Sequence, residues 1–348
     1  WVICATRSGI ETNPITKGQL YYNGGSSIWS PTGHKIAQSP VVSPLELSPG
    51  LNGIYCAQIS LVDADQQRAY CLAKRRPALY SPTLALHRSP TDINATATQS
   101  SVNLVAAQWP VNQTLLASLS VNENELVVLP ELSAIPYTTD ATVILASAEP
   151  QGGSFEQTLI SAAQQGKGYI VGSYPEIDTD KIYHTVVLAG PAGEILARYR
   201  VTHLSQRDHG WATAGEQFSV TTTPIGRIAL AAAHELKILE VGGMYGALRA
   251  DIIAAPAGEP SSLKVEIDQK LYSVTNPPTG RADYIPYAVA TLNQLWVVCG
   301  GRQLGDFTAA AIYGPEPVVL TPTIIAEADT TAAQYRTLLP SPYTWINQ

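Results

Sequence analysis

The sequence predicts an α/β fold in which helices cover layers of β-sheet, and two observations lead to this prediction. Short, continuous apolar runs such as 126–130 and 228–232 have the length and composition of strands that are buried on both faces. Segments of helical length at 154–165, 236–249 and 283–293 separate such runs. An alternation of strands and helices favours a layered α/β architecture.

In chain order, residues 101–348 alternate between expected strands and expected helices, with one hairpin. The expected strands lie at 102–107, 126–130, 169–173, 186–188, 195–199, 228–232, 251–255 and 295–299, and the expected helices at 111–124, 154–165, 236–249 and 283–293. Ala189–Gly193 (AGPAG) lies between two apolar runs and predicts a hairpin turn. Residues 321–348 are rich in proline and are expected to form an extended C-terminal arm that crosses an interface.

The composition bounds the class of protein. The 348 residues are 45% hydrophobic and 14% charged, which excludes a mainly disordered chain. The net charge is −7 and no basic run is longer than Lys74–Arg76, so nucleic acid is not an expected partner. No apolar run reaches about 18 residues, so no membrane span is expected. The four cysteines have no metal-binding spacing and fit a reduced, cytoplasmic protein (Cys4, Cys56, Cys71, Cys299).

An internal repeat links the two ends of the chain. Trp1–Arg7 (WVICATR) resembles Trp296–Arg302 (WVVCGGR), and Ser27–Pro31 (SIWSP) resembles Ala311–Pro315 (AIYGP). The two pairs are offset by 295 and 284 residues, so the first copy is expected to have a longer loop within residues 8–26. The repeat is therefore out of phase with the start of the chain.

This repeat predicts three regions. Residues 1–71 are expected to be the C-terminal part of a first unit, 72–100 a tail and linker, and 101–348 a complete second unit with the C-terminal arm. The front of the first unit is expected upstream on the same gene or on a separate chain. Residues 1–70 should not fold alone, because their strands need sheet partners.

Several motifs, in order and with plausible gaps, suggest a family. They are Leu126–Leu132 (LVVLPEL), Ala197–Leu204 (ARYRVTHL), Ile225–Glu235 (IGRIALAAAHE), Gly246–Pro256 (GALRADIIAAP) and, in the partial copy, Tyr22–Gly33 (YNGGSSIWSPTG). On these motifs the chain resembles the nitrilase, or carbon–nitrogen hydrolase, superfamily. The resemblance implies a four-layer αββα nitrilase-like sandwich, with a partial second copy at the N-terminus. It also implies a Glu–Lys–Cys set in which a cysteine attacks a nitrile or amide carbon.

Position by position, the resemblance implies that this set is incomplete. Glu131 retains the general-base position, but Val201 stands at the lysine position and Ala233 at the cysteine position. Valine cannot stabilise an oxyanion and alanine is no nucleophile. Arg200 is a poor substitute for the lysine, because neighbouring strand residues point to opposite faces. Asp208 is the candidate for a second acidic residue of the family.

Four further residues are expected to line the site: His203, Trp211, His234 and Glu235. His209 and His234 raise the question of a metal, but no third ligand has a recognisable spacing, so no metal and no cofactor are expected.

The leading hypothesis is a tandem protein. The complete unit would be a pseudo-hydrolase with a structural or assembly role, and any nitrile or amide hydrolysis would belong to the unit whose front lies upstream of Trp1. Its partners would be other nitrilase-like units, in the same chain or in a homo-oligomer, held through helices near 236–249 and 283–293. Two alternatives remain open: a non-catalytic small-molecule-binding or filament-forming protein, and a nitrilase or amidase inactivated by a Cys-to-Ala change.

Overall fold

The computed structural model divides the chain into two compact units. The smaller unit comprises Trp1–Lys74 and Leu263–Val274, and the larger comprises Arg75–Ser262 and Thr275–Gln348. The structure describes residues 1–31, 35–40, 54–84, 102–112, 114, 119–258, 264–267, 270–273, 284–304, 307–308, 310–314, 325–329 and 332–339.

The larger unit contains a nine-stranded sheet. Its main path runs β10 (Ile195–Arg200), β9 (Lys181–Ala189), β8 (Tyr169–Asp178), β7 (Glu125–Val128), β6 (Val102–Pro110), β17 (Gly301–Leu304) and β18 (Phe307–Thr308), and β21 (Ala332–Leu339) joins β6 and β20 (Ile325–Asp329). The central strands β6, β7 and β8 are parallel, whereas β8, β9 and β10 form antiparallel pairs.

A second sheet of five strands belongs to the same unit. Its order is β11 (Val220–Thr223), β12 (Gly226–Leu230), β13 (Ile252–Ala254), β16 (Trp296–Cys299) and β19 (Ala311–Tyr313). The parallel middle of this sheet, β12–β13–β16, is flanked by an antiparallel strand at each edge.

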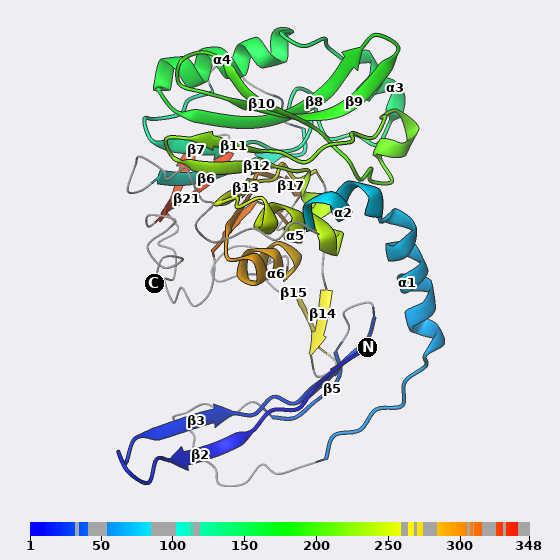
Figure 1. Cartoon of the computed structure of the whole chain (residues 1–348), viewed down its shortest axis with the longest axis vertical. Helices are drawn as coiled ribbons and strands as arrows, with labels where there is room; N and C mark the ends of the chain where they lie inside the picture. Colours follow the sequence, from blue (N-terminus) through cyan, green and yellow to red (C-terminus); the bar gives the residue numbers. More distant parts are fainter. Residues whose placement is uncertain are drawn as a thin grey trace. The chain divides into compact units, whose positions relative to one another are not determined.

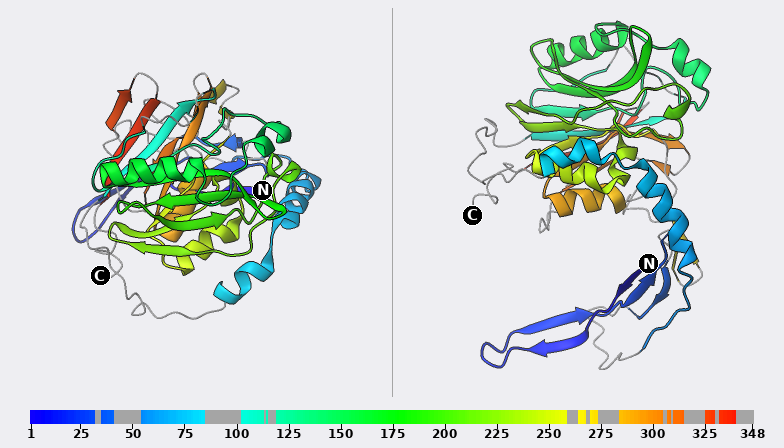
Figure 2. Two further views of the ribbon diagram at one scale, coloured as in Figure 1. Left: turned by 90° about the horizontal axis from the view of Figure 1, so that it is seen from above. Right: turned by 45° about the vertical axis from the view of Figure 1, so that its right-hand side comes forward.

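Helices cover the outer face of each sheet, which completes four layers (Figures 1 and 2). Helix α4 (Ser154–Gly166) packs on the nine-stranded sheet, with α3 (Ala141–Ala146) beside it in Figure 1. Helices α5 (Leu239–Ala247) and α6 (Tyr284–Asn293) pack on the five-stranded sheet, and α2 (Pro77–Leu84) lies against α5. The expected αββα sandwich is therefore confirmed.

The period of two along each strand explains the layers. Leu104 and Ala106 of β6 lie in the core between the sheets, whereas Val105 and Ala107 face the helical layer of α4. In β12, Ile228 and Leu230 face the other sheet and Ala229 faces α5 and α6. Because both faces of these strands are buried, the runs are apolar throughout, which is why they could be recognised in the sequence.

One expected helix is wrong. Residues 111–112 and 123–124 form turns and 119–122 have no regular structure, while 115–118 lie outside the described residues. Glu125 explains the local fold, because its carboxylate accepts hydrogen bonds from the backbone N–H and the side-chain amide of Asn122. Asn124 adopts a positive φ of 62°, which a helix interior does not allow.

The other differences are of extent. Strand β11 was not expected, β8 and β9 are longer than their predicted runs, and the helix expected over 236–249 is split into a 3₁₀ turn at Ala233–Lys237 and α5. Within the expected arm 321–348, β21 pairs with β6 of the same unit, and residues 321–324, 330–331 and 340–348 lie outside the described part. Likewise 77–84, expected as tail and linker, is helix α2, and 85–100 lie outside the described part.

The smaller unit has short strands and almost no core. It contains the sheet β1 (Val2–Cys4), β4 (Ser27–Trp29), β5 (Lys35–Gln38), the hairpins β2–β3 (Ser8–Thr12, Gln19–Asn23) and β14–β15 (Lys264–Ile267, Lys270–Ser273), and helix α1 (Val62–Lys74). Among the residues of this unit whose side chains are described, Ile28 is the one buried apolar residue. Val2 and Ile3 are 57% and 70% exposed.

The strand pairs that the sequence repeat aligns have the same register. β1 and β4 pair Val2 with Trp29, Ile3 with Ile28 and Cys4 with Ser27, and β16 and β19 pair Val297 with Tyr313, Val298 with Ile312 and Cys299 with Ala311. Both pairs are antiparallel. The long loop expected within 8–26 is the β2–β3 hairpin.

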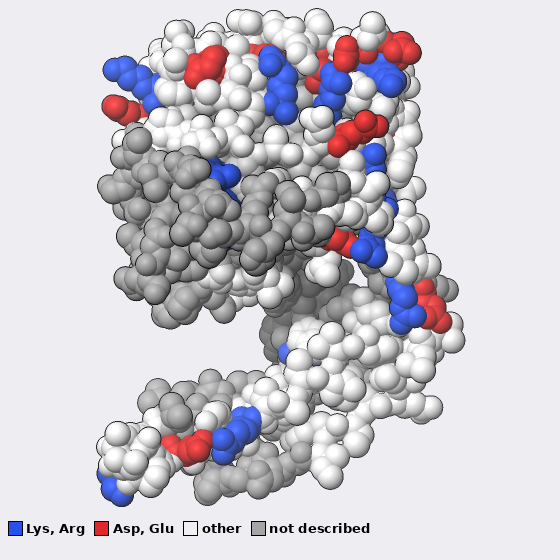
Figure 3. Space-filling view, viewed as in Figure 1, with Lys and Arg blue, Asp and Glu red and all other residues white. Residues whose placement is uncertain are grey.

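The surface of the larger unit mixes both signs of charge. Figure 3 shows basic and acidic side chains interspersed over the layer that holds α4 and β8–β10. Arg198 pairs with Glu156 there, and Arg200 pairs with Glu176 and Asp178. In the part of the chain that the structure describes, no helix has the length and apolarity to cross a membrane.

Candidate active site

Glu131 follows the end of strand β7, and its side chain lies among Arg207 and two histidines. Its backbone N–H donates to the carbonyl of Ala257, which fixes the chain after Pro130. The carboxylate is 8% exposed. One oxygen, Oε2, accepts a hydrogen bond from Nη1 of Arg207 at 3.0 Å. The other, Oε1, lies 3.4 Å from Nδ1 of His234 and 3.9 Å from Nε2 of His184.

The two positions that differ from the family pattern are filled by apolar groups. Val201 is fully buried in the core between the sheets. Its N–H donates to the carbonyl of His184 and its carbonyl accepts from Gly215, both at 2.8 Å. Ala233 begins the 3₁₀ turn after β12, where its N–H donates to the carbonyl of Pro256.

The three positions of the implied catalytic set meet around two histidines. His184 bonds to Val201 through the backbone and lies near Glu131 through its side chain. Ala233 directly precedes His234, which lies against the same carboxylate. The fold therefore brings together the positions that the sequence singled out, but without a thiol or an amine among them.

Asp208 is buried in this cluster rather than solvated. It is 1% exposed and its Oδ1 lies 3.1 Å from Nδ1 of His184. Its Oδ2 accepts hydrogen bonds from the backbone and the hydroxyl of Ser205, at 2.9 and 2.6 Å. Nε2 of His234 lies 3.5 Å away. Asp208 thus holds the two imidazoles from the side opposite to Glu131.

Ser173 contacts His184, which in turn contacts Asp208, so the three residues form a Ser–His–Asp series of contacts. Its Oγ lies 3.3 Å from Nε2 of His184. The same hydroxyl oxygen accepts the N–H of Leu132 at 2.8 Å, and Ser173 is fully buried in β8. A nucleophile must reach its substrate, so we interpret Ser173 as a residue that positions His184 and the backbone after Glu131.

Glu235 connects the segment of Val201 to the turn of Ala233. Its Oε1 accepts hydrogen bonds from the N–H groups of Thr202 and His203 at 2.9 Å and from the hydroxyl of Tyr199 at 2.8 Å. Its Oε2 accepts the N–H of Ala232 at 3.0 Å. Because all of these groups are buried, their hydrogen bonds to Glu235 hold the segment of Val201 against the turn of Ala233.

The remaining expected site residues also lie at or near the cluster. His203 is buried, bonds to Tyr80 of α2 at 2.9 Å, and accepts Nε2–H of His234 on its carbonyl at 2.8 Å. The Trp211 ring packs against His184, with centroids 5.8 Å apart. His209 is exposed. No cluster of His, Cys, Asp or Glu among the described residues could hold a metal ion.

Electrostatics keep Glu131 ionised. Burial acts to raise the pKa of the Glu131 carboxyl, but the hydrogen bond from His234 and the charges of His184 and Arg207 outweigh it and lower the pKa. Burial acts to lower the pKa of His234, yet Glu131 and Asp208 raise it to about 9. His234 is therefore an imidazolium at neutral pH, held between two carboxylates.

The other two carboxylates are ionised for similar reasons. Burial acts to raise the pKa of Asp208, but the charge and hydrogen bond of His184 outweigh it and lower the pKa well below its ordinary range. Burial also acts to raise the pKa of Glu235, and the hydrogen bond from His203 and the charge of His234 lower it. The hydrogen bonds and charges around each carboxyl thus outweigh its burial and lower its pKa.

Comparison with known proteins identifies the family. The family model for carbon–nitrogen hydrolases matches residues 95–275, just over half of the chain. The chain belongs to the carbon–nitrogen hydrolase family.

Relatives within this family include omega-amidases. The chain is 29% identical over 242 residues to the chloroplastic omega-amidase of Arabidopsis thaliana, which is 62% of this chain and 62% of the relative. It is 26% identical over 194 residues to the omega-amidase NIT2 of Homo sapiens, which is 49% of this chain and 70% of the relative. The chain therefore spans less than two thirds of the Arabidopsis protein.

Solved structures agree on the fold. Nit3 of Saccharomyces cerevisiae, a nitrilase-superfamily member, superposes with a TM-score of 0.52 at 18% identity and covers 73% of this chain and 96% of its own. An amidase from Nesterenkonia gives a TM-score of 0.51 at 17% identity, covering 72% of this chain and 93% of its own.

Three residues of this candidate site were not anticipated from the sequence. His184 in β9 and Ser173 in β8 lie among both apolar and polar strand residues, so the local sequence gives no distinct signal for them. Arg207 directly precedes Asp208 in a loop, and nothing in its local sequence indicates that it is buried and paired with Glu131.

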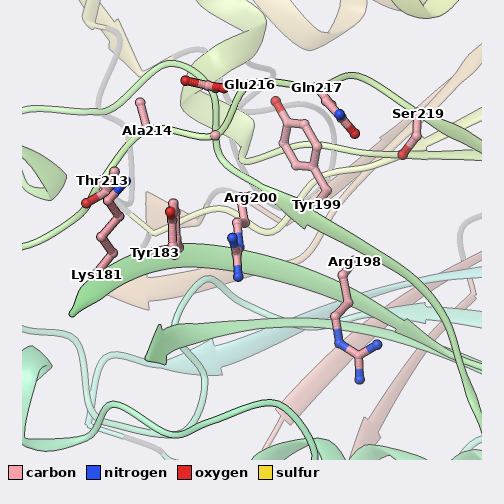
Figure 4. A pocket seen from close by; sticks show the side chains of 11 residues that line it. Lys181, Tyr183, Arg198, Tyr199, Arg200, Thr213, Ala214, Glu216, Gln217 and Ser219 are labelled. Atoms are coloured by element: carbon pink, nitrogen blue, oxygen red, sulfur yellow. The ribbon is translucent and has the colours of Figure 1, made fainter. Parts of the chain in front are cut away.

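A separate recess of about 410 Å³ opens over β9 and β10 (Figure 4). Lys181, Tyr183, Arg198 and Arg200 line one side, and the loop 213–219 lines the other. Glu131, Val201 and Ala233 are not among its lining residues. Because both arginines already bind buried carboxylates, the recess offers few free charges to a ligand.

Proposed function

We propose that the larger unit is a non-catalytic carbon–nitrogen hydrolase unit with a structural role in a cytoplasmic tandem protein. Any hydrolysis of nitriles or amides would belong to the other nitrilase-type unit, of which residues 1–71 are the C-terminal part. The front of that unit would come from the same gene or from a separate chain.

One observation supports this proposal above the others: Glu131, the base position, has no free carboxylate oxygen. Oε2 is paired with Arg207 and Oε1 faces His184 and His234. A general base must accept a proton from a nucleophile within hydrogen-bond reach. With Ala233 at the nucleophile position, there is no such proton to accept. Since catalytic groups act as a unit, these losses together should remove almost all activity.

The tandem part of the proposal is supported by the smaller unit. Arg302 follows β16 and is fully buried, where it donates to the carbonyls of Leu132 and Ile135 from the front of its own unit. Arg7, at the equivalent position of the repeat, is 68% exposed and pairs with nearby Glu11. A front half-unit would supply the missing carbonyls to Arg7. It would also cover Val2 and Ile3.

The assembly role is supported by the helices of the outer layer. Leu239 of α5 is 83% exposed, and Tyr287 and Leu292 of α6 are 43% and 76% exposed. Part of the expected pairing face is occupied within the unit, because α2 lies on α5 and Arg75 pairs with Glu240. We propose that the uncovered apolar side chains of α5 and α6 pair with another nitrilase-like unit.

The variant Ala233→Cys tests the proposal and separates it from a Cys-to-Ala inactivated enzyme. We expect this variant of the full chain to release no ammonia from butyramide or succinamic acid, because Val201 offers no donor and Glu131 stays paired. Thermal unfolding shows that the variant is folded, and Ser173→Ala serves as a matched substitution in the same cluster. Ammonia release at enzymatic rates by Ala233→Cys would support the inactivated enzyme instead.

A further inference from the structure

Arg207 has an unused face inside the protein. Its side chain is 5% exposed, and Nη1 donates to Oε2 of Glu131 at 3.0 Å. The guanidinium lies over the ring of Tyr137, 4.8 Å from the centroid. Nε and Nη2 are buried and have no hydrogen-bond partner among the described residues. Buried polar groups in native proteins are nearly always satisfied, so these two donors need an explanation.

The two free donors form one geometric unit. Nε and Nη2 lie on the same edge of a guanidinium and point in parallel, which matches the two oxygens of a carboxylate. The protein uses this edge elsewhere: Arg198 donates from Nε and Nη2 to the two oxygens of Glu156, at 3.0 and 2.7 Å. The edge that is filled at Arg198 has no partner at Arg207 within the part of the chain that the structure describes.

The neighbourhood of Arg207 also favours an added negative charge. The pKa of the buried Arg302 is lowered to about 10, first by burial and then by the charge of Arg207, while Glu131 acts in the opposite direction. Two guanidinium groups therefore repel each other within the protein interior. The Nη1 side of Arg207 is tightly packed against Gly258. A Cβ added to Gly258 would lie 3.0 Å from Nη1 and 1.9 Å from Oε2 of Glu131.

We propose that Arg207 binds the carboxylate of a small organic acid through Nε and Nη2. This inference rests on the proposed function, since it gives the non-catalytic site a ligand class. A monoanionic carboxylate fits better than phosphate or sulfate, because Glu131 and Asp208 lie close by and repel a dianion. It fits better than a carboxamide, because an amide presents one acceptor oxygen to a fork of two donors.

Saturable binding to the full-length chain tests the proposal. Acetate and propionate are titrated at constant ionic strength and followed by thermal shift and calorimetry, beside acetamide, propionamide and phosphate. We expect acetate or propionate to bind at least tenfold more tightly than its amide and than phosphate. Arg207→Lys, which keeps the charge but loses the fork, should weaken carboxylate binding at least tenfold. Arg198→Lys is the matched control and should leave it unchanged.

Each outcome bears on the proposal. No saturable carboxylate binding, equal binding of acid and amide, or unchanged affinity in Arg207→Lys would overturn it. The comparison of acid with amide uses the unaltered chain, so it stands even if Arg207→Lys does not fold. Ammonia released from propionamide in the same samples would refute the non-catalytic function, and the acetate titration would still report on Arg207.

Discussion

In the proposed non-catalytic site, the contacts of Glu131 would keep it from acting as a general base. In a general base, an unengaged oxygen faces the proton to be removed. Here both oxygens face cations, and the lowered pKa means that the carboxylate gains little from accepting a proton. Breaking such a pair by removing one partner leaves an uncompensated buried charge, so Arg207 and His234 are held in place together with Glu131.

Also at the residue scale, the raised pKa of His234 predicts that the stability of the protein depends on pH. Its pKa rises from 6.5 to about 9 in the folded protein, so its stabilisation is complete below about pH 6.5 and is lost as the pH rises through 9. The shift corresponds to about 3 kcal/mol at most. We expect the free energy of unfolding to fall between pH 6.5 and 9.5, and to fall clearly less in His234→Asn, as measured by urea titration.

The groups that face His234 are Glu131, Asp208, Glu235 and the ring of His184, together with the His203 carbonyl. His209→Asn is the control, because this histidine is exposed and next to the same loop. If the free energy of unfolding fell with pH equally in His234→Asn and in the unaltered chain, the assigned imidazolium would be contradicted.

Sequence reasoning reached the positions of the site but not its contacts. Glu131, Asp208 and Glu235 could be singled out because motifs surround them, and the structure places all three around the histidines. The pairing of Glu131 with Arg207 joins residues 76 positions apart in the chain, and no local pattern encodes that approach. The roles of these residues in function remain predictions.

At the scale of elements, the two adjacent glycines of α5 have different environments. A Cβ on Gly242 would meet Val289 of α6 and Asn293 at 3.0 Å, whereas a Cβ on Gly243 meets nothing within 4 Å. We expect Gly243→Ala to raise the free energy of unfolding by about 1 kcal/mol through helix propensity. Gly242→Ala should lower it by about 1–2 kcal/mol, because Val289 is stiff and the helices must separate.

Each glycine is the control for the other, since both lie in the interior of the same short helix. Denaturant unfolding of the two single variants gives both values. Equal effects of the two substitutions would mean that α5 and α6 do not approach as closely as the structure has them.

The elements also show where local sequence suffices. Strands buried on both faces, such as β7 and β12, and the helix α4 follow from apolar runs and their length. The expected helix at 111–124 failed because Glu125 closes a turn on Asn122, a side-chain contact that helix periodicity does not reveal. Strand β11 carries three threonines and one valine, so it lacked the apolar run on which the other predictions relied.

At the scale of the whole molecule, the two units should differ in local stability. The described side chains of the smaller unit bury one apolar residue, whereas four clusters of buried apolar side chains stabilise the larger unit. Few buried contacts mean frequent local opening. We expect trypsin to cut native protein at Arg7 and Lys17 well before Arg198 or Arg227, as followed by mass spectrometry.

A front half-unit supplied in trans should slow cleavage at Arg7 if residues 1–71 belong to a divided nitrilase-type unit. If trypsin cut at Arg7 and Lys17 as slowly as at Arg198 and Arg227, the smaller unit would be as stable as the larger one. It would then need no further sheet partner.

The most direct test of the non-catalytic site is ammonia release by the unaltered 348-residue chain. The chain is incubated with butyramide, succinamic acid and a simple nitrile, beside Glu131→Gln and beside an active carbon–nitrogen hydrolase as positive control. We predict no release above the uncatalysed rate for either form of this chain. Release by the unaltered chain that Glu131→Gln abolishes would show that Glu131 still acts as a base, and would contradict the assignment.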